Sequence, residues 1–199
     1  LDVFRLKIPA DLVVLSASNS GTLVYLPEAV PKTALQWYDS GGRVLGSLGA
    51  PGFYTAPRVS PDGKKLAFAL FESTGTQSDL WVMDLQYERN FRLTQKSGVY
   101  LGPVWSRDSE RLMFMCQPKG VQDLCVRSLR EGGDMELLFA SPNWKTSGSW
   151  MPDGRSVLFD EQDPETNRDL KMLNLSDKPE SRVLLATPFD EEYPEASPD

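Results

Sequence analysis

A nine-residue element recurs along this chain at a nearly constant interval. Its clearest copies are SPDGKKLAF at 60–68, SRDSERLMF at 106–114 and MPDGRSVLF at 151–159. The aspartates at its third position follow one another at steps of 46, 45 and 46 residues, the final Asp199 included. A degenerate copy without the aspartate, SNSGTLVY, stands at 18–25. A period of this length indicates a fold built from copies of one supersecondary unit.

Each unit contains short runs with the composition of β-strands, separated by turn-forming residues. The run DLWVMDL at 79–85 is repeated as DLCVRSL at 123–129 and DLKMLNL at 169–175. Four short strands in each unit of about 45 residues predict an all-β fold, a β-propeller of four-stranded antiparallel blades. The innermost strands are expected near 12–17, 55–60, 101–106, 146–151 and 193–197. A β-sandwich is the alternative, but it does not explain why the same residues recur.

The repeat boundaries predict one β-propeller segment over 1–199 with about four complete blades. The expected blades cover 12–48, 55–95, 101–140 and 146–187, with partial blades at 1–8 and 193–199. The chain opens on an expected outer strand, Val3–Lys7, and closes on an expected inner strand, so its two ends cannot pair into a normal blade. We therefore expect a piece of a larger ring, with self-association through the broken blade ends.

The aspartate of the repeated turn has a local structural explanation. Proline presets the first central turn position, aspartate bonds nearby backbone amides, and glycine accepts the position that leads into the next strand. Asp62, Asp108 and Asp153 are accordingly predicted to be structural turn residues. A role as metal ligands or acids is the alternative interpretation.

Composition excludes several function classes. The net charge of −7 argues against nucleic-acid binding, which needs a basic face. No apolar run is long enough to span a membrane, and no signal peptide opens the sequence. Cys116 and Cys125 fall in successive expected strands, and two buried free thiols are the favoured interpretation over a cross-strand disulfide.

No catalytic motif is present in the sequence. The chain contains no histidine, which removes the commonest general base and the commonest metal ligand. It has no G-x-S-x-G elbow, no glycine-rich phosphate loop before a helix, and no kinase catalytic motif. By itself the chain is predicted not to be an enzyme and to need no cofactor, calcium excepted.

The negative charge is concentrated in two segments, DEQDPE at 160–165 and DEEYPE at 190–195. Without their eight acids the chain has 20 acidic and 21 basic residues. In a propeller both segments belong to loops on the same face, so they could bind calcium or a basic partner. The candidate binding residues there are Asp160, Glu161, Asp163, Asp190, Glu191 and Glu192. Two solvated loops are the alternative.

Aromatic residues also occur in the loops that enter the inner strands. They are Phe53, Tyr54, Tyr100, Trp144, Phe189 and Tyr193. Aromatic side chains exposed at loop tips favour protein recognition, which makes Tyr54, Tyr100, Trp144 and Tyr193 candidate binding residues. The alternative is that these rings pack between blades.

The element S-P-D-G-K/R-x-L-x-F, followed by D-L-W-V-M-D-L and R-L-T, resembles the TolB-type WD-like β-propeller repeat. The stretch 36–68 is similar to propellers fused to bacterial serine/threonine kinases or transcription regulators. The resemblance implies a ring of six or more blades and an extracytoplasmic or periplasmic location. It also implies a non-catalytic binding, sensor or scaffold module that recognises a protein, a peptide or a small ligand through one loop face. The alternative is the propeller part of a larger enzyme, either a prolyl-oligopeptidase-like peptidase or a receptor kinase.

Overall fold

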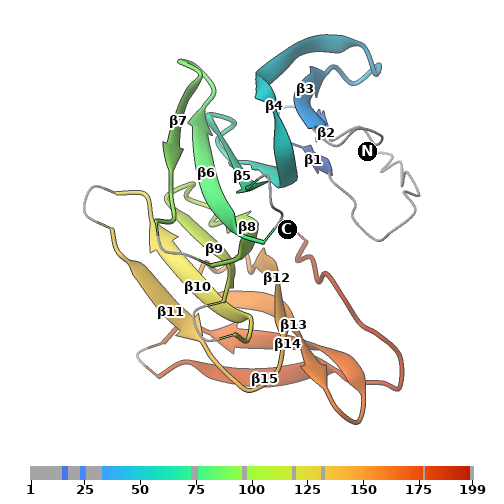
Figure 1. Cartoon of the computed structure of the whole chain (residues 1–199). Coiled ribbons are helices and arrows are strands. Elements are labelled where there is room, and N and C mark those ends of the chain that lie inside the picture. The colour runs from blue at the N-terminus through green and yellow to red at the C-terminus, as the bar shows by residue number, and fades with distance from the viewer. Residues whose placement is uncertain are drawn as a thin grey trace.

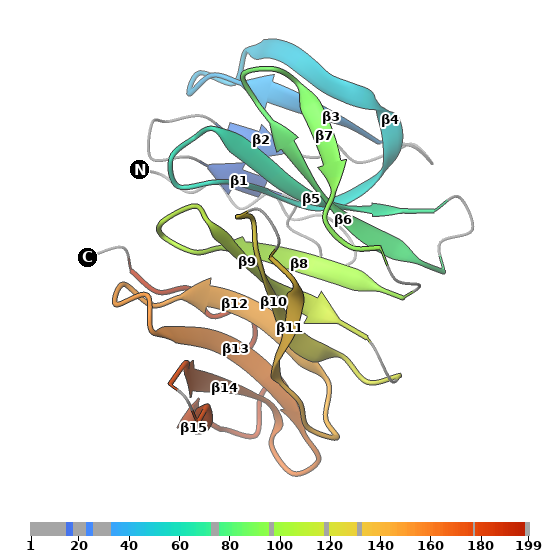
Figure 2. The ribbon, with the colours of Figure 1, turned by 90° about the vertical axis from the view of Figure 1, so that its left-hand side faces the viewer.

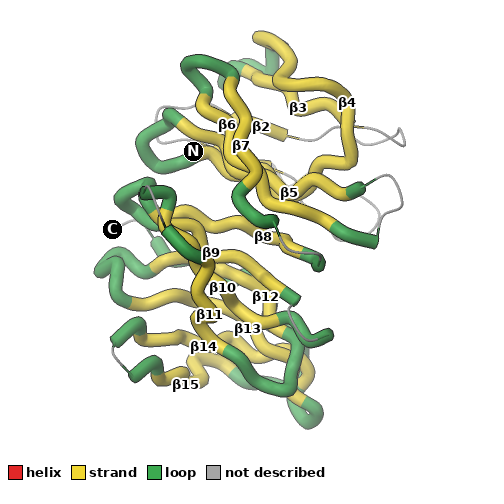
Figure 3. Tube along the Cα trace, turned by 60° about the vertical axis from the view of Figure 1, so that its left-hand side comes forward, coloured by secondary structure: helices red, strands yellow, loops and turns green. Residues whose placement is uncertain are grey.

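The computed structural model describes residues 15–17, 23–25, 33–72, 76–95, 98–117, 120–130, 133–176 and 178–197. All regular secondary structure in these ranges is β-strand, and Figure 3 shows strands joined by loops without a helix. Within the same ranges no helix is long and apolar enough to cross a membrane.

The strands form three hydrogen-bonded sheets in which neighbours in sequence are neighbours in space. The first sheet has seven strands: β1 (Leu15–Ala17), β2 (Leu23–Tyr25), β3 (Thr33–Tyr38), β4 (Val44–Val59), β5 (Lys65–Phe71), β6 (Ser78–Asp84) and β7 (Arg89–Arg92). The second has four: β8 (Tyr100–Trp105), β9 (Arg111–Cys116), β10 (Asp123–Ser128) and β11 (Met135–Phe139). The third also has four: β12 (Lys145–Trp150), β13 (Ser156–Asp163), β14 (Asn167–Asn174) and β15 (Glu180–Leu185).

The seven-stranded sheet consists of two blades that share one strand. The 16-residue β4 pairs with β3 from Val44 to Gly52 and with β5 from Phe53 to Val59. The chain therefore runs from the outer strand of the first blade directly into the inner strand of the second. Figure 2 shows the first two blades together at the top, the third blade below them and the fourth at the bottom. The structure confirms the predicted fold class, a segment of a β-propeller with antiparallel blades.

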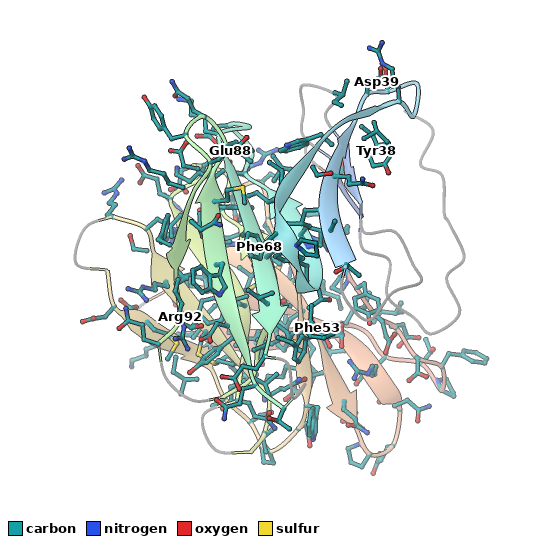
Figure 4. All side chains as sticks on the ribbon, turned by 45° about the horizontal axis from the view of Figure 1, so that its top comes forward. Tyr38, Asp39, Phe53, Phe68, Glu88 and Arg92 are labelled. Atoms are coloured by element: carbon teal, nitrogen blue, oxygen red, sulfur yellow. A yellow bond between two sulfur atoms is a disulfide. The ribbon has the colours of Figure 1, made fainter. Side chains whose placement is uncertain are left out.

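The hydrophobic core is divided among the interfaces between blades. Leu35 and Leu48 of the first blade pack with Phe68 and Met83 of the second, and Figure 4 labels Phe68 in the middle of the view, close to β4 and β5. The second and third blades meet around Leu80 and Phe114, and the third and fourth around Met113, Leu124, Phe159 and Leu173. Each sheet buries its apolar faces only against its neighbours, which is why the repeat must recur for the fold to be stable.

The repeated turn is stabilised by the hydrogen bonds that its residue types provide. In the second blade, the Ser60 hydroxyl donates to Asp62 Oδ1 at 2.6 Å, and the Lys64 amide donates to the same oxygen at 3.0 Å. Gly63 follows with φ of 71°. Asp108 and Asp153 accept the amides two residues downstream in the same way. All three aspartates thus lie at turns between the first and second strands of a blade.

In the third and fourth blades a tryptophan before the turn connects the blade to the preceding one. Trp105 Nε1 donates to the Arg58 carbonyl at 2.8 Å, and Trp150 Nε1 donates to the Val104 carbonyl at 3.3 Å. The Arg111 guanidinium lies 4.5 Å from the centre of the Trp150 ring. The tryptophans recur in the sequence because the inner strands of adjacent blades lie side by side in the same register.

The inner strands of the second and third blades share a bulge with a left-handed residue. The register shifts between Thr55 and Arg58 and between Leu101 and Val104. Within these bulges Ala56 has φ of 48° and Gly102 has φ of 58°. A Cβ on Gly102 would lie 2.7 Å from Ser147 Oγ, whose hydroxyl donates to the Gly102 carbonyl. Since Ala56 adopts the same left-handed φ, the close approach of the next inner strand is what requires glycine at position 102.

The expected inner strand at 193–197 is not a strand, and this prediction was wrong. Among the described residues no strand pairs with this segment. Two of its backbone amides instead donate to side chains: the Tyr193 amide donates to Asp160 Oδ2, and the Ala196 amide donates to Ser149 Oγ. Tyr193 nevertheless has φ of 54°, which matches the bulge residues of the earlier inner strands. The segment therefore lies beside β12 in an inner-strand conformation without a strand partner. The expected outer strand Val3–Lys7, the partial blade at 1–8 and residues 12–14 lie outside the described residues.

The two cysteines form a disulfide, so the interpretation as free thiols was wrong. Cys116 on β9 and Cys125 on β10 have Cα atoms 5.9 Å apart. Cys116 lies opposite Asp123 and Cys125 opposite Phe114, which places the cysteines diagonally across one antiparallel pair. This separation is within the range that a disulfide spans without backbone movement. The sequence did not give the register of this hairpin, and the register decides whether the two sulfurs can meet.

Candidate functional site

The two acidic segments meet at the end of β13 and β14 in the fourth blade. Arg168 joins them, since its Nη1 is 2.6 Å from Asp160 Oδ1 and its Nε is 2.9 Å from Glu192 Oε1. The same Nη1 donates to Thr146 Oγ1 at 2.8 Å. From the other direction, the Tyr193 amide donates to Asp160 Oδ2 at 3.2 Å. The side chains of Asp160 and Arg168 therefore fix the segment after β15 against the blade.

Asp160 is completely buried in this arrangement. Burial raises the pKa of its carboxyl, while the Tyr193 amide and the Arg168 guanidinium oppose that shift. A buried carboxylate with a bonded arginine is typical of a structural ion pair. Asp160 is consequently not a surface acid available to an external cation.

Glu161 belongs to a second buried group of charges. Its Oε2 accepts from Lys171 Nζ at 2.6 Å, and its Oε1 is 4.0 Å from Lys145 Nζ and accepts from the Ser141 hydroxyl. Lys145 is fully buried, and its ammonium also contacts Asp123 Oδ1 of the third blade at 3.1 Å. This group connects the third and fourth blades through charge pairs below the loops.

Lys145 also donates hydrogen bonds to several backbone carbonyls. Its Nζ donates to the carbonyl of Asn143 at 2.6 Å, of Ser141 at 3.2 Å and of Gln122 at 3.3 Å. These bonds hold the loop at 141–144 in place from below. Trp144 is the last residue of that loop, and its carbonyl accepts the Gln162 amide at 2.8 Å.

The remaining acids of the two segments have local partners or are exposed. Asp163 caps the turn between β13 and β14 by accepting the Glu165 amide at 2.9 Å. Glu191 accepts from the Thr187 amide at 3.3 Å and from its hydroxyl. Asp190 is exposed. Among the described residues no group of three or more acidic or sulfur side chains is placed to hold a metal ion. The geometry of the described carboxylates therefore gives the expectation of calcium no support.

Two of the predicted aromatic binding residues pack against core phenylalanines, Tyr54 half-buried and Tyr100 buried. Tyr54 makes an edge-on contact with Phe68 at 5.2 Å between ring centres, and its hydroxyl donates to the Ala50 carbonyl at 2.6 Å. Tyr100 is buried against Phe114 at 6.3 Å. Burial raises the pKa of both tyrosines. Both residues lie on inner strands, β4 and β8, and not at loop tips. The expectation of an exposed ring was wrong for Tyr100, which is buried, while Tyr54 is half-buried.

Three other aromatic side chains are exposed: Trp144, Phe189 and Tyr193, at 42%, 76% and 57% of their full accessible area. All three come from segments fixed to the end of the β13–β14 hairpin. The Trp144 carbonyl accepts the Gln162 amide, and the Tyr193 amide donates to Asp160. Next to Phe189, the Pro188 carbonyl accepts from Asn167 Nδ2 at 3.2 Å. We call these three residues the aromatic loop face. It combines exposed rings with a backbone held by buried charges.

Sequence reasoning did not identify the basic residues that organise this face. Arg168, Lys145 and Lys171 lie outside the two acidic segments, so the segments looked unpaired. One signal was available for Lys145, which occupies the repeat position of Tyr100, 45 residues earlier. A lysine in place of a core aromatic indicates a buried carboxylate partner.

The site combines bonded carboxylates with exposed aromatic rings. Asp160 and Glu161 pair with arginine and lysine, Asp163 caps a turn, and the chain contains no histidine. What remains at the surface is three aromatic rings with exposed acids such as Asp190 at their side. Such a surface suits recognition of another macromolecule.

Comparisons with known proteins agree with the fold. Over 108 residues the chain is 26% identical to the uncharacterized peptidase YuxL of Bacillus subtilis, covering 52% of this chain and 16% of YuxL. Over 125 residues it is 25% identical to the Tol-Pal system protein TolB of Wolinella succinogenes, covering 62% of this chain and 28% of that protein. The chain thus spans less than a third of either curated relative.

Solved structures share the same architecture at low identity. TolB from Acinetobacter baumannii superimposes with a TM-score of 0.72 at 20% identity, over 90% of this chain and 45% of that chain. The propeller domain of the Trilobed protease from Pyrococcus furiosus gives 0.59 at 17% identity, over 89% of this chain and 59% of that chain. The sequence model of the TolB beta propeller domain matches residues 19–199. The chain therefore belongs to the TolB β-propeller domain family.

Proposed function

We propose that this chain is a non-catalytic recognition module that binds a protein or peptide partner through the aromatic loop face of its fourth blade. The observation that carries the proposal is the exposure of Trp144, Phe189 and Tyr193 on a backbone fixed by the Arg168 and Lys145 ion pairs. Preorganised aromatic side chains bind with little loss of conformational entropy, and they are enriched among the residues that dominate interface energetics.

The acids beside these rings indicate the charge of the partner. Asp190 is exposed, and Glu192 is bonded to Arg168 yet keeps about a third of its side chain exposed (36%). A partner with basic residues around an apolar centre would complement this surface. Such attraction acts mainly on the rate of association and weakens as salt screens it. Binding through this face should accordingly become slower as ionic strength rises.

The test uses a photo-reactive amino acid at position 189 and a matched control at position 87. Tyr87 is 63% exposed and lies in the turn between β6 and β7, on the opposite face of the propeller. In cells that make the protein, position 189 should form a discrete cross-linked adduct and position 87 should not. Equal adducts at both positions, or none at 189, would contradict the proposal.

Affinity for the captured partner then provides the quantitative test. Replacing Trp144, Phe189 and Tyr193 together by alanine should weaken binding at least tenfold, since central aromatic residues typically contribute about 2 kcal/mol or more on truncation. Tyr87→Ala should leave the affinity within twofold. The stability of the triple variant should stay near that of the parent, because all three side chains are exposed.

A second candidate is the propeller part of a larger enzyme. The match to YuxL and to the Trilobed protease propeller favours it, because both relatives are peptidases by name. TolB and peptidase propellers share this fold, so the fold does not separate the two candidates. A hydrolase or kinase domain encoded in the same reading frame would support the enzyme candidate. Peptidase activity in these 199 residues alone would refute the non-catalytic proposal.

A further inference from the structure

A second surface lies on the other face of the propeller, between the third and fourth blades. A cavity of about 310 Å³ opens there beside β11, and its apolar lining includes Trp150, Val126, Leu138, Leu175 and Pro179. This volume is at the lower end of the range typical of ligand sites. We call it the turn-face groove, because it lies at the end of the blades that carries the repeated turn.

One wall of the groove is an unpaired strand edge. β11 is the last strand of its sheet and pairs only with β10 among the described residues. Figure 1 shows it at the outer side of the third blade, with the fourth blade beside it. Leu137 on this strand lines the groove and is 56% exposed. A free edge next to an apolar cavity is the arrangement by which sheets accept an added peptide strand, with the cavity receiving a side chain.

The groove also contains a cation, Arg111, that interacts with the Asp108 carboxylate only at longer range among the described acids. The Arg111 guanidinium stacks on Trp150 and donates one bond, to the Gly154 carbonyl at 3.4 Å. No described acidic side chain forms a salt bridge with it. A guanidinium carries five N–H donors, so most of its donors are left for a ligand. Glu136 also lines this groove. Because it would repel a second carboxylate, an acidic ligand group has to approach from the Arg111 side.

We propose that the turn-face groove binds an extended peptide segment of a partner protein. The peptide adds as a strand to the free edge of β11 and inserts one large apolar side chain beside Trp150. A carboxylate of the same peptide pairs with Arg111. This site is separate from the aromatic loop face, and neither proposal depends on the other.

The test measures peptide binding to the full chain by nuclear magnetic resonance of leucine methyl groups. The probe is the capped peptide Ac-Thr-Val-Thr-Leu-Thr-Asp-NH2. It should cause saturable shifts at Leu137, Leu138 and Leu175. A peptide with alanine in place of leucine should bind at least tenfold more weakly, and one with asparagine in place of aspartate at least fivefold. Methylation of alternate backbone nitrogens should abolish binding, because it removes the donors that pair with β11.

Variants of the protein locate the site. Leu137→Glu should weaken binding of the leucine peptide at least tenfold. The control is Val183→Glu, at the corresponding position 46 residues later on β15, where the side chain is 53% exposed. It should leave the affinity within twofold. Arg111→Gln should remove the preference for aspartate over asparagine.

Three results would overturn the proposal. The first is the absence of saturable shifts with the leucine peptide up to its solubility limit. The second is equal loss of binding in Leu137→Glu and Val183→Glu, which would indicate general adhesion to exposed strand edges. The third is equal affinity of the aspartate and asparagine peptides for the unmodified chain, a measurement that does not depend on whether Arg111→Gln folds.

Discussion

Replacement of Lys145 by methionine tests whether buried charges hold the fourth blade to the third. Methionine keeps most of the side-chain volume but removes the ammonium, which contacts Asp123 at 3.1 Å and the Asn143 carbonyl at 2.6 Å. Glu161, with 4% of its side chain exposed, would lose a cation at 4.0 Å. Breaking a buried ion pair by removing one partner costs about 3–5 kcal/mol, because the other charge stays buried. We expect a loss of that size in the free energy of unfolding.

The measurement is urea unfolding of the oxidised protein, followed by tryptophan fluorescence, with the denaturant slope unchanged between variants. Lys171→Met is the matched control, since that side chain is 15% exposed and its one salt bridge among the described residues is to Glu161. It should cost about 1.5–3 kcal/mol, as expected for one hydrogen bond to a charged group. Adding Asp123→Asn to Lys145→Met should recover at least about 1 kcal/mol relative to the sum of the single losses.

A loss of less than about 1 kcal/mol in Lys145→Met, well below the value expected for a buried pair, would refute a stabilising role of the Lys145 charge pairs. Equal destabilisation by Lys145→Met and Lys171→Met would refute it as well. Additive losses in the double variant would show that Asp123 and Lys145 do not interact across the blade interface.

Three further predictions concern the turn, the last segment and an unpartnered acid. A hydrogen bond from the Ser106 hydroxyl lowers the pKa of the Asp108 carboxyl in the folded protein. The ionised Asp108 therefore stabilises the fold above its unfolded pKa of about 3.9, and this stabilisation is lost as pH falls through the lower folded pKa. Urea midpoints of the wild type and Asp108→Asn should therefore converge below pH 4, whereas a constant gap would contradict this origin. Gly148→Ala places a Cβ 2.6 Å from Pro194 Cγ and should cost about 1–3 kcal/mol by thermal unfolding; no change would show that 193–197 does not pack on β12. Asp169 Oδ1 is buried without a hydrogen-bond partner among the described residues, so Asp169→Asn should be neutral or stabilising by up to about 1 kcal/mol in urea, and a clear loss would reveal a missed partner.

The sequence by itself determined the architecture. The recurring turn specifies its own hydrogen bonds, because Ser60 and Asp62 satisfy neighbouring amides without help from the rest of the chain. The apolar runs around it can be buried only between sheets, so the period of about 45 residues was enough to predict the blades. Even Tyr193 adopts the left-handed conformation of the repeat, although no strand pairs with its segment in the described structure.

The partners of individual side chains were decided by the tertiary structure. Tyr100 and Lys145 occupy the same position in successive blades, yet one packs on Phe114 and the other binds Asp123. The acidic run from Asp160 looked like an open cation site, but Arg168 reaches it from the next strand. In a repeat fold each side chain meets residues on an adjacent strand or blade, from a few to more than forty positions away. Local pattern therefore fixes the backbone, while hairpin register and blade packing decide which groups pair and which stay exposed.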